Sequence, residues 1–264
     1  MRLRIFSFIK FYFKANSKYA IHSPFVYDFI ESVLESNKNF YSYLPIECLR
    51  NQLKANKDVI RVNDLGAGSK AIKSNNRKVS QIAKHSIQNR KTAQLLFRLI
   101  DHYKCKSIIE LGTSLGVTTA YLASASKNGQ VYTLEGCSAT LQVAKRGSKK
   151  LRINNVTFIN GDFDEQLPQL INKIKQVDFV YFDGNHKKDA TLRYFNICKM
   201  NATLSSIFIF DDINWSEEMQ EAWNQIKLDE KVTLTIDLFH IGIVFFHSVK
   251  IKNDFKLRSS MFFN

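Results

Sequence analysis

Short strand-like segments alternate with helix-like segments from Lys106 onward, and this alternation constrains the fold more than any other feature of the chain. Strands rich in β-branched and aromatic residues are predicted at 107–111, 130–135, 156–160, 177–183 and 206–211. Helical patterns lie near 117–127, 138–150, 164–175, 188–201 and 216–228. Strands joined by helices of this length form βαβ units. The sequence therefore predicts an α/β fold with a doubly wound, mostly parallel sheet.

The pattern changes after residue 228. Two more strand-like segments, 232–238 and 243–247, are separated only by residues 239–242, which are too few for a crossover helix. They must pair as an antiparallel hairpin, so we expect a seven-stranded sheet that ends in a hairpin. Residues 92–248 would then form one domain, and 249–264 a basic C-terminal tail.

Residues 1–91 are predicted to form a basic, mainly helical N-terminal region that caps the domain. Ser23 and Pro24 mark a helix start, as N-cap and first helical residue, and a second helix is expected over 91–103. The first ten residues are basic and aromatic, and Lys10 and Lys14 interrupt their apolar run. An amphipathic helix fits them, which either packs on the domain or touches a membrane surface.

The charge of the chain is uneven. The net charge is +14, and residues 1–105 hold 19 Lys and Arg against 7 Asp and Glu. This asymmetry suits an anionic partner, such as nucleic acid, an acidic substrate or lipid, although a Lys-, Asn- and Ile-rich composition also produces it. The four cysteines form no C-x-x-C pair, which predicts free thiols in the cytoplasm. No apolar run is long enough to span a membrane, so we expect a soluble protein.

The main motif, residues 108–119, lies where a strand turns into a helix, and three interpretations compete for it. A dinucleotide loop needs G-x-G-x-x-G, which this G-x-x-x-G segment lacks. The segment Gly112-Thr-Ser-Leu-Gly116 also matches the G-x-S-x-G elbow of serine hydrolases, with Ser114, Asp211 or Asp212, and His240 in the order of a triad. Against that interpretation, the elbow strand opens the sheet and no oxyanion loop precedes it.

The third interpretation uses more of the chain. Glu110-x-Gly112-x-x-x-Gly116 resembles the first motif of class I S-adenosylmethionine-dependent methyltransferases, which are Rossmann-like. The resemblance implies that Glu135, which ends the second strand, binds the ribose of this cofactor. It also implies that Asp162 and Phe163 hold the adenine, and that the cofactor is bound by Glu110, Gly112, Thr113, Ser114, Gly116, Glu135, Asp162, Phe163 and Asp183. A second glycine-rich segment, Asp64–Ser69, lacks a following strand with a terminal acid and is interpreted as a turn or a cover for the site.

The segments after the fourth and fifth strands resemble those of the cation-dependent O-methyltransferases related to the catechol and caffeoyl-CoA enzymes. The resemblance implies Asp183, Asp211 and Asp212 as ligands of Mg²⁺ and His186 as the catalytic base, with Asp183 beside it. Two residues depart from that family, since Asp212 replaces Asn and His186 replaces Lys. Histidine is a suitable base at neutral pH, because its usual pKa is about 6.5.

These features predict an enzyme that transfers a methyl group from S-adenosylmethionine to a hydroxyl of a small acceptor. The basic N-terminal region suggests an anionic acceptor, and the resemblance leaves a requirement for Mg²⁺ and a homodimer open. Two other classes of function stay open as well. One is a serine hydrolase built on Ser114, and the other is a non-catalytic protein that binds nucleic acid through the basic region.

Overall fold

The computed structural model describes residues 2–63, 74–247 and 252–258, without the side chains of residues 2–7. The chain forms two compact units, each with its own internal contacts. One unit consists of Met1–Asn37 and Gln176–Asn264, and the other of Lys38–Lys175. The predicted domain boundaries at residues 91 and 248 stay predictions.

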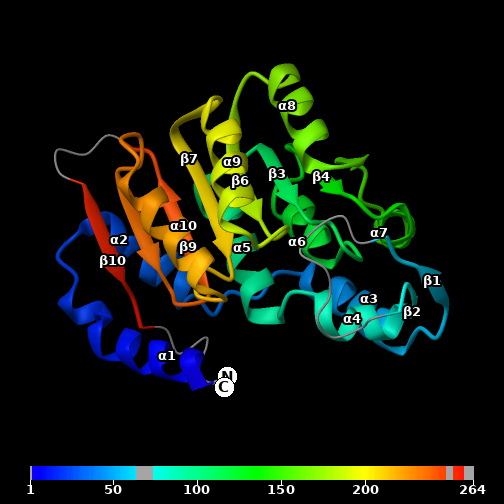
Figure 1. The fold of residues 1–264 in the computed structure, drawn as a ribbon, viewed down its shortest axis with the longest axis horizontal. Helices are drawn as coiled ribbons and strands as arrows, with labels where there is room; N and C mark the ends of the chain where they lie inside the picture. The colour runs from blue at the N-terminus through cyan, green and yellow to red at the C-terminus, as the bar shows by residue number, and fades with distance from the viewer. Residues whose placement is uncertain (1, 64–73, 248–251, 259–264) are drawn as a thin grey trace. The chain divides into compact units, whose positions relative to one another are not determined.

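The unit of residues 38–175 contains three parallel strands in the order β3-β4-β5, each followed by a helix (Figure 1). The strands are β3 (Ser107–Leu111), β4 (Gln130–Glu135) and β5 (Val156–Asn160), and the helices are α5 (Arg90–Tyr103), α6 (Val117–Ala125), α7 (Ser138–Lys150) and α8 (Phe163–Lys173). The register places Glu110 beside Thr133. The predicted βαβ pattern is confirmed in this unit.

The earlier part of the same unit packs against these helices. It contains α3 (Tyr43–Ala55), an antiparallel pair of strands, β1 (Val59–Arg61) and β2 (Asn76–Lys78), and α4 (Val79–Ser86). Apolar residues of α3 and α4 share a core with α5 and α6. The hydroxyl of Tyr121 in α6 donates a hydrogen bond of 2.8 Å to Glu47, which also accepts one from Arg50. This ion-paired contact fixes α3 to α6.

The other unit contains five strands in the order β10-β8-β9-β7-β6. The strands β6 (Val177–Phe182) and β7 (Ala202–Asp211) are parallel, and α9 (Lys188–Lys199) connects them. After α10 (Glu217–Leu228), the strands β8 (Leu234–Asp237) and β9 (Ile241–Phe245) pair antiparallel with each other, and β9 is antiparallel to β7. The predicted terminal hairpin is therefore confirmed.

One strand of this unit was not predicted. β10 (Asn253–Lys256) lies in the segment expected to be a tail and pairs in parallel with β8. The hydroxyl of Thr235 donates a 2.6 Å hydrogen bond to Asp254, so a side chain reinforces the pairing. A short, polar edge strand carries no apolar alternation, and its pairing is therefore invisible in the sequence. Among the described residues the strands β3 to β10 number eight, rather than the seven expected.

The first helices belong to the same unit as β10. They are α1 (Arg2–Lys14), α2 (Pro24–Phe29) and two short turns, η1 (Lys18–Ala20) and η2 (Ile30–Leu34). α1 packs Phe11 and Ala15 against Phe239, while Phe13 on its other side is 77% exposed. As predicted, Ser23 caps α2 by accepting from the N–H of Val26. Among the described residues no helix has the length and apolar character that crossing a membrane requires.

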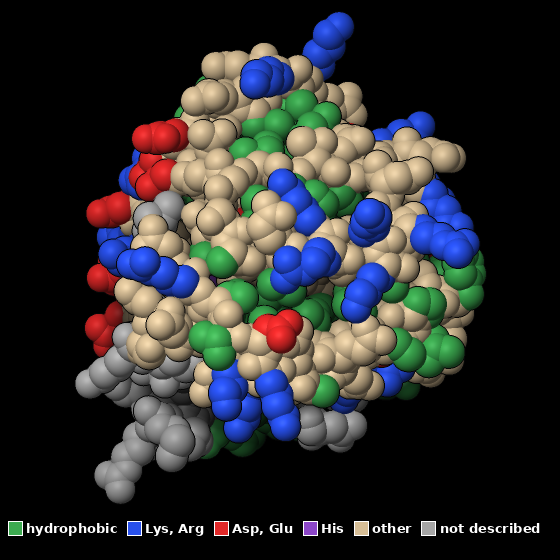
Figure 2. Space-filling model, turned by 90° about the vertical axis from the view of Figure 1, so that its right-hand side faces the viewer, with side chains coloured by type: hydrophobic (Ala, Val, Ile, Leu, Met, Phe, Trp, Pro, Cys, Tyr) green, Lys and Arg blue, Asp and Glu red, His purple; other side chains and the backbone are tan. Residues whose placement is uncertain are grey.

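The basic character of the chain extends beyond its first third. Figure 2 views the side on which β1 and α7 lie in Figure 1, and Lys and Arg side chains are spread over this face. α7 alone exposes four cations, at Lys145, Arg146, Lys149 and Lys150. The excess of positive charge in residues 1–105 is therefore not the only basic feature, because the exposed cations of α7 lie after residue 105.

Candidate active site

The loop between β3 and α6 contains three residues with positive φ, namely Gly112 at 104°, Ser114 at 48° and Gly116 at 78°. Its backbone N–H groups are largely used within the protein. Those of Gly112 and Thr113 donate to Leu134 O, and that of Gly116 donates to Thr113 O. A pyrophosphate cradle needs such N–H groups to face the ligand. The loop is therefore poorly suited to a dinucleotide, in agreement with its missing third glycine.

Gly116 is required by packing as well as by its backbone angle. A Cβ at this position would lie 2.7 Å from the Cβ of Ala144 in α7. The close approach of the loop to α7 holds the beginning of α6 in place, since Gly116 is the N-cap residue of α6. Any side chain here would move the loop.

Glu135 at the end of β4 holds this loop through its carboxylate. One oxygen, Oε2, accepts 2.8 Å from the N–H of Ser114, and the other, Oε1, accepts 2.9 Å from the N–H of Cys137. Glu135 is half-buried, and each carboxylate oxygen can accept more than one hydrogen bond. Two fixed, partly exposed oxygens fit a pair of neighbouring ribose hydroxyls. This pair of hydrogen-bond acceptors thus suits the cofactor implied by the sequence.

Glu110 lies beneath the loop and is fully buried. Its Oε2 accepts from the hydroxyls of Thr119 at 2.5 Å and Thr133 at 2.6 Å, and Thr133 lies 2.5 Å from the hydroxyl of Thr113. Burial raises the pKa of the Glu110 carboxyl to about 8, although the two hydroxyl bonds oppose this shift. Oε1 has no hydrogen-bond partner among the described residues. Glu110 therefore supports the loop from below.

Sequence analysis did not identify Thr119 and Thr133. Thr133 is the β4 residue paired with Glu110 in the parallel register, so the two side chains lie on the same face of the sheet. The alternation of buried residues in β4 could have indicated that Thr133 faces the interior. The sequence alone does not determine which residue of β4 lies opposite Glu110, because the register of the two strands is set by the fold.

The predicted adenine-binding residues follow β5. Asp162 is the N-cap of α8, and its side chain accepts 2.9 Å from the N–H of Asp164. Phe163 begins the helix. Both are half-buried, and Asp162 retains a second carboxylate oxygen for a ligand. The remaining predicted cofactor residue, Asp183, lies in the other unit, after β6, and Asp64–Ser69 lie outside the described residues.

The acidic residues predicted after β6 and β7 come together within their own unit. Asp211 ends β7, is buried, and hydrogen-bonds the side chain of Asp183. Nε2 of His186 lies 3.7 Å from Oδ1 of Asp183. Burial, and then the charge of Asp212, raise the pKa of Asp211 to about 6, against the opposing effect of His186. The carboxyl ends of two parallel strands thus carry a cluster of interacting acids and one imidazole.

The cluster does not form a metal site as it stands. No group of three or more His, Cys, Asp or Glu side chains in the described part of the chain is arranged to hold a metal ion. Asp183 and Asp211 are hydrogen-bonded to each other through their side chains. Asp212 has a φ of 52°, in the left-handed region that few non-glycine residues adopt. The predicted metal ligands Asp183 and Asp211 interact with each other, and the binding of Mg²⁺ by these acids stays a prediction.

Comparison with known proteins agrees with this site. The family model described as a methyltransferase domain matches residues 109–213, which include the loop after β3 and the ends of β6 and β7. A protein of Fusobacterium nucleatum, named as an uncharacterized RNA methyltransferase, is 26% identical over 144 residues. That match covers 52% of this chain and 31% of the relative, so the chain corresponds to about a third of that protein.

Solved structures share the fold. An O-methyltransferase of Bacillus cereus in complex with SAH aligns with a TM-score of 0.59 at 18% identity, over 83% of this chain and 96% of that one. TomG, an O-methyltransferase of Streptomyces achromogenes in complex with SAM, aligns with a TM-score of 0.58 at 14% identity, over 84% of this chain and 95% of that one. A Staphylococcus aureus protein provisionally named a caffeoyl-CoA O-methyltransferase aligns with a TM-score of 0.55 at 20% identity, over 63% of this chain and 88% of that one.

These findings confirm the predicted Rossmann-like α/β fold and the resemblance to the O-methyltransferases. They support neither the hydrolase interpretation of Ser114 nor a non-catalytic nucleic-acid-binding protein. The matched domain spans the loop at Gly112–Gly116, the terminal acid of β4 and the acids after β6 and β7. Residues 109–213 thus match the family model described as a methyltransferase domain, and the chain shares the fold of solved O-methyltransferases.

Proposed function

We propose that the protein methylates a hydroxyl group of a small acceptor, with His186 as the general base. The observation that carries the proposal is the position of His186, 3.7 Å from Asp183 at the carboxyl end of β6. An imidazole held by a carboxylate is a suitable proton acceptor near neutral pH. The structural neighbours named as O-methyltransferases support the same class of acceptor.

The proposed cofactor is S-adenosylmethionine, whose sulfonium supplies an electrophilic methyl group. Glu135 would accept hydrogen bonds from the ribose, and Asp162 from the adenine amino group. Glu110 would not touch the ligand, because it is fully buried, and would instead set the position of the loop through Thr113 and Thr133. The SAM and SAH complexes of the structural neighbours support this cofactor.

In the proposed reaction His186 takes the proton of the acceptor hydroxyl at Nε2. The oxygen forms a bond to the methyl carbon as the bond from that carbon to sulfur breaks. Asp183 orients the imidazole and stabilises its protonated form. The proton transfer and the orientation of the base thus use side chains of this chain alone.

Calorimetric titration with S-adenosylhomocysteine tests the cofactor site. We expect Glu135→Ala to weaken binding by at least about tenfold, because it removes a charged acceptor of two hydroxyls. Glu135→Gln, which keeps one acceptor oxygen and much of the support for the loop, should fall between this variant and the wild type. Glu165→Ala removes an exposed carboxylate of α8 and is the matched control. Equal affinity of all four proteins would refute the assignment of Glu135.

Transfer of a radiolabelled methyl group to catechol and to 3,4-dihydroxybenzoate tests the acceptor class. Loss of a general base costs roughly 10²- to 10⁴-fold in rate, so His186→Ala should retain little activity, and added imidazole should restore part of it. Methylation of aniline in place of the phenols, or full activity of His186→Ala, would contradict the proposal.

RNA is a second candidate acceptor, favoured by one relative and by one surface. The relative in Fusobacterium nucleatum is named as an RNA methyltransferase, and α7 exposes four cations. The same assay with total bacterial RNA separates the candidates. Label in RNA, with a yield that falls steeply between about 50 and 200 mM salt, would favour RNA over a small acceptor.

A further inference from the structure

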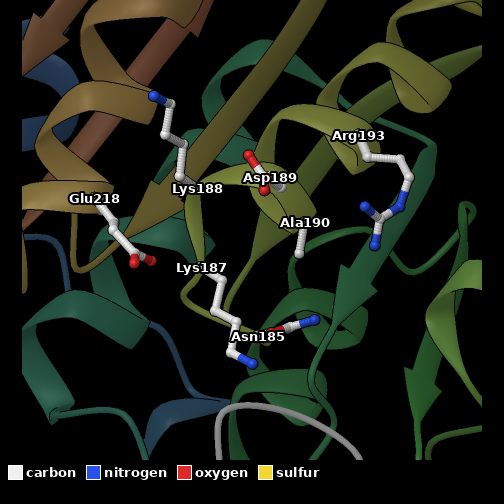
Figure 3. A pocket seen from close by; sticks show the side chains of 7 residues that line it. All are labelled: Asn185, Lys187, Lys188, Asp189, Ala190, Arg193 and Glu218. Atoms are coloured by element: carbon white, nitrogen blue, oxygen red, sulfur yellow. The ribbon is translucent and has the colours of Figure 1, made fainter.

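A cavity of about 400 Å³ opens beside the segment that contains His186. Asn185 and Lys187, the two chain neighbours of His186, line it together with the first turns of α9 and Glu218 of α10 (Figure 3). This volume accommodates a small organic molecule. An inference about this cavity rests on the proposed function, because it concerns the acceptor of the same reaction.

The charges that line this cavity are segregated. Lys188 donates a 2.6 Å hydrogen bond to Glu221, and the charges of Asp189 and Glu218 act on it as well, which raises the pKa of Lys188. The negative charges of Glu221, Asp189 and Glu218 therefore act on Lys188. In Figure 3 Lys188 extends away from Lys187 and from Asn185. One part of the cavity is thus neutralised by internal ion pairing.

The other part carries two cations. Lys187 makes no side-chain ion pair or hydrogen bond within the described part of the chain, and Arg193 lines the cavity one turn into α9, with its guanidinium 5.4 Å from the ring of Tyr194. Lys187 is the N-cap residue of α9, and the backbone dipole favours an anion at this end of the helix. Oδ1 of Asn185 is buried and has no partner among the described residues, which adds an unused acceptor to the same wall.

We propose that this cavity binds the anionic group, a carboxylate or a phosphate, of the methyl acceptor through Lys187 and Arg193. Arg193 offers a planar fork of donors that matches either group, and Lys187 a compact charge. Because Lys187 directly follows His186, an acceptor held in this way is tethered next to the proposed base. The two cations would therefore select hydroxylated acids over neutral phenols.

Protein-observed NMR titration with matched ligand pairs tests the proposal without a methylation assay. Benzoate is compared with benzamide, and phenyl phosphate with phenol, so each pair differs chiefly in charge and the two anions are tested separately. We expect one or both anions to shift the amide signals of residues 185–193, and the neutral partners to bind about tenfold more weakly or not at all. Equal binding within both pairs would overturn the proposal.

Lys187→Ala and Arg193→Ala should each weaken the binding of the preferred anion by about tenfold. Lys231→Ala is the matched control, since it removes one exposed cation beyond the far end of α10, a helix about 18 Å long. An unchanged affinity in the first two variants, or an equal loss in the control, would overturn the proposal. Titration of the same samples with S-adenosylhomocysteine separates the two failures, because a protein that binds the cofactor but not the anions refutes the acceptor cavity alone.

Discussion

The buried carboxyl of Glu110 makes the stability of the protein depend on pH in a way that one substitution can isolate. Glu110 is 0% exposed, and burial raises its pKa from 4.5 to about 8. Glu110→Gln keeps the size of the side chain and an oxygen that accepts from Thr119 and Thr133. It removes the carboxyl group, which is the only part of this side chain that can ionise.

The direction of the effect follows from proton linkage. Between pH 4.5 and 8 the folded protein holds a proton on Glu110 that the unfolded chain has released. The stabilisation is therefore complete below pH 4.5 and is lost as the pH rises through 8. The loss is about 1.4 kcal/mol for each pH unit, or about 5 kcal/mol across the whole range. Glu110→Gln lacks this loss.

Thermal and urea unfolding at pH 5, 6, 7 and 8 measures the difference between the wild type and the variant. From pH 5 to pH 8 the variant should gain about 4 kcal/mol relative to the wild type, which corresponds to roughly 8 °C in Tm for a chain of this size. Glu165→Gln, at an exposed position of α8, should show little of this gain. Parallel pH profiles for wild type and Glu110→Gln would mean that Glu110 is ionised in the folded protein, and would refute the reasoning.

Three further changes have expected outcomes. Gly116→Ala should lower stability by about 1–3 kcal/mol in urea unfolding, because its Cβ would meet Ala144 at a positive φ; an unchanged midpoint would show that the loop can shift freely. Ser216→Ala should cost about 1 kcal/mol, because Ser216 caps α10 by accepting from the N–H of Met219, whereas Ser216→Asp should cost little. Methyl transfer should persist within about twofold after treatment with EDTA if His186 and Asp183 suffice for the proton transfer; its abolition, with recovery on adding Mg²⁺, would show that the acids after β6 and β7 hold a cation.

The parts of the fold that the sequence predicts are those with a strong periodic signal. The bounds of β3, β4, β5 and α7 agree with the predicted segments to the residue. These strands are short apolar runs bounded by turns, and α7 alternates buried and exposed residues at helical spacing. The hairpin β8–β9 was predictable for another reason, since its loop is too short for any other connection.

The parts that could not be predicted depend on contacts between distant segments. β10 exists only because β8 offers an unpaired edge, and the polar sequence of β10 gives no sign of it. At the site, the sequence indicated Glu110 and Glu135 through their positions at strand ends. It could not distinguish the fully buried Glu110 from the half-buried Glu135, because burial depends on the helices that cover each strand end.

Asp211 provides a comparison in the other unit that separates stability from catalysis. Burial raises its pKa from 3.8 to about 6, so the stabilisation from its bound proton is present below pH 3.8 and is lost as the pH rises through 6. Asp211→Asn should therefore be more stable than the wild type at pH 7. If the carboxyl is retained because it acts on the acceptor site with Asp183 and His186, the same variant should transfer methyl groups more slowly. Unfolding and transfer assays on one preparation decide the matter, since a variant that is both less stable and fully active would show that Asp211 is a structural residue.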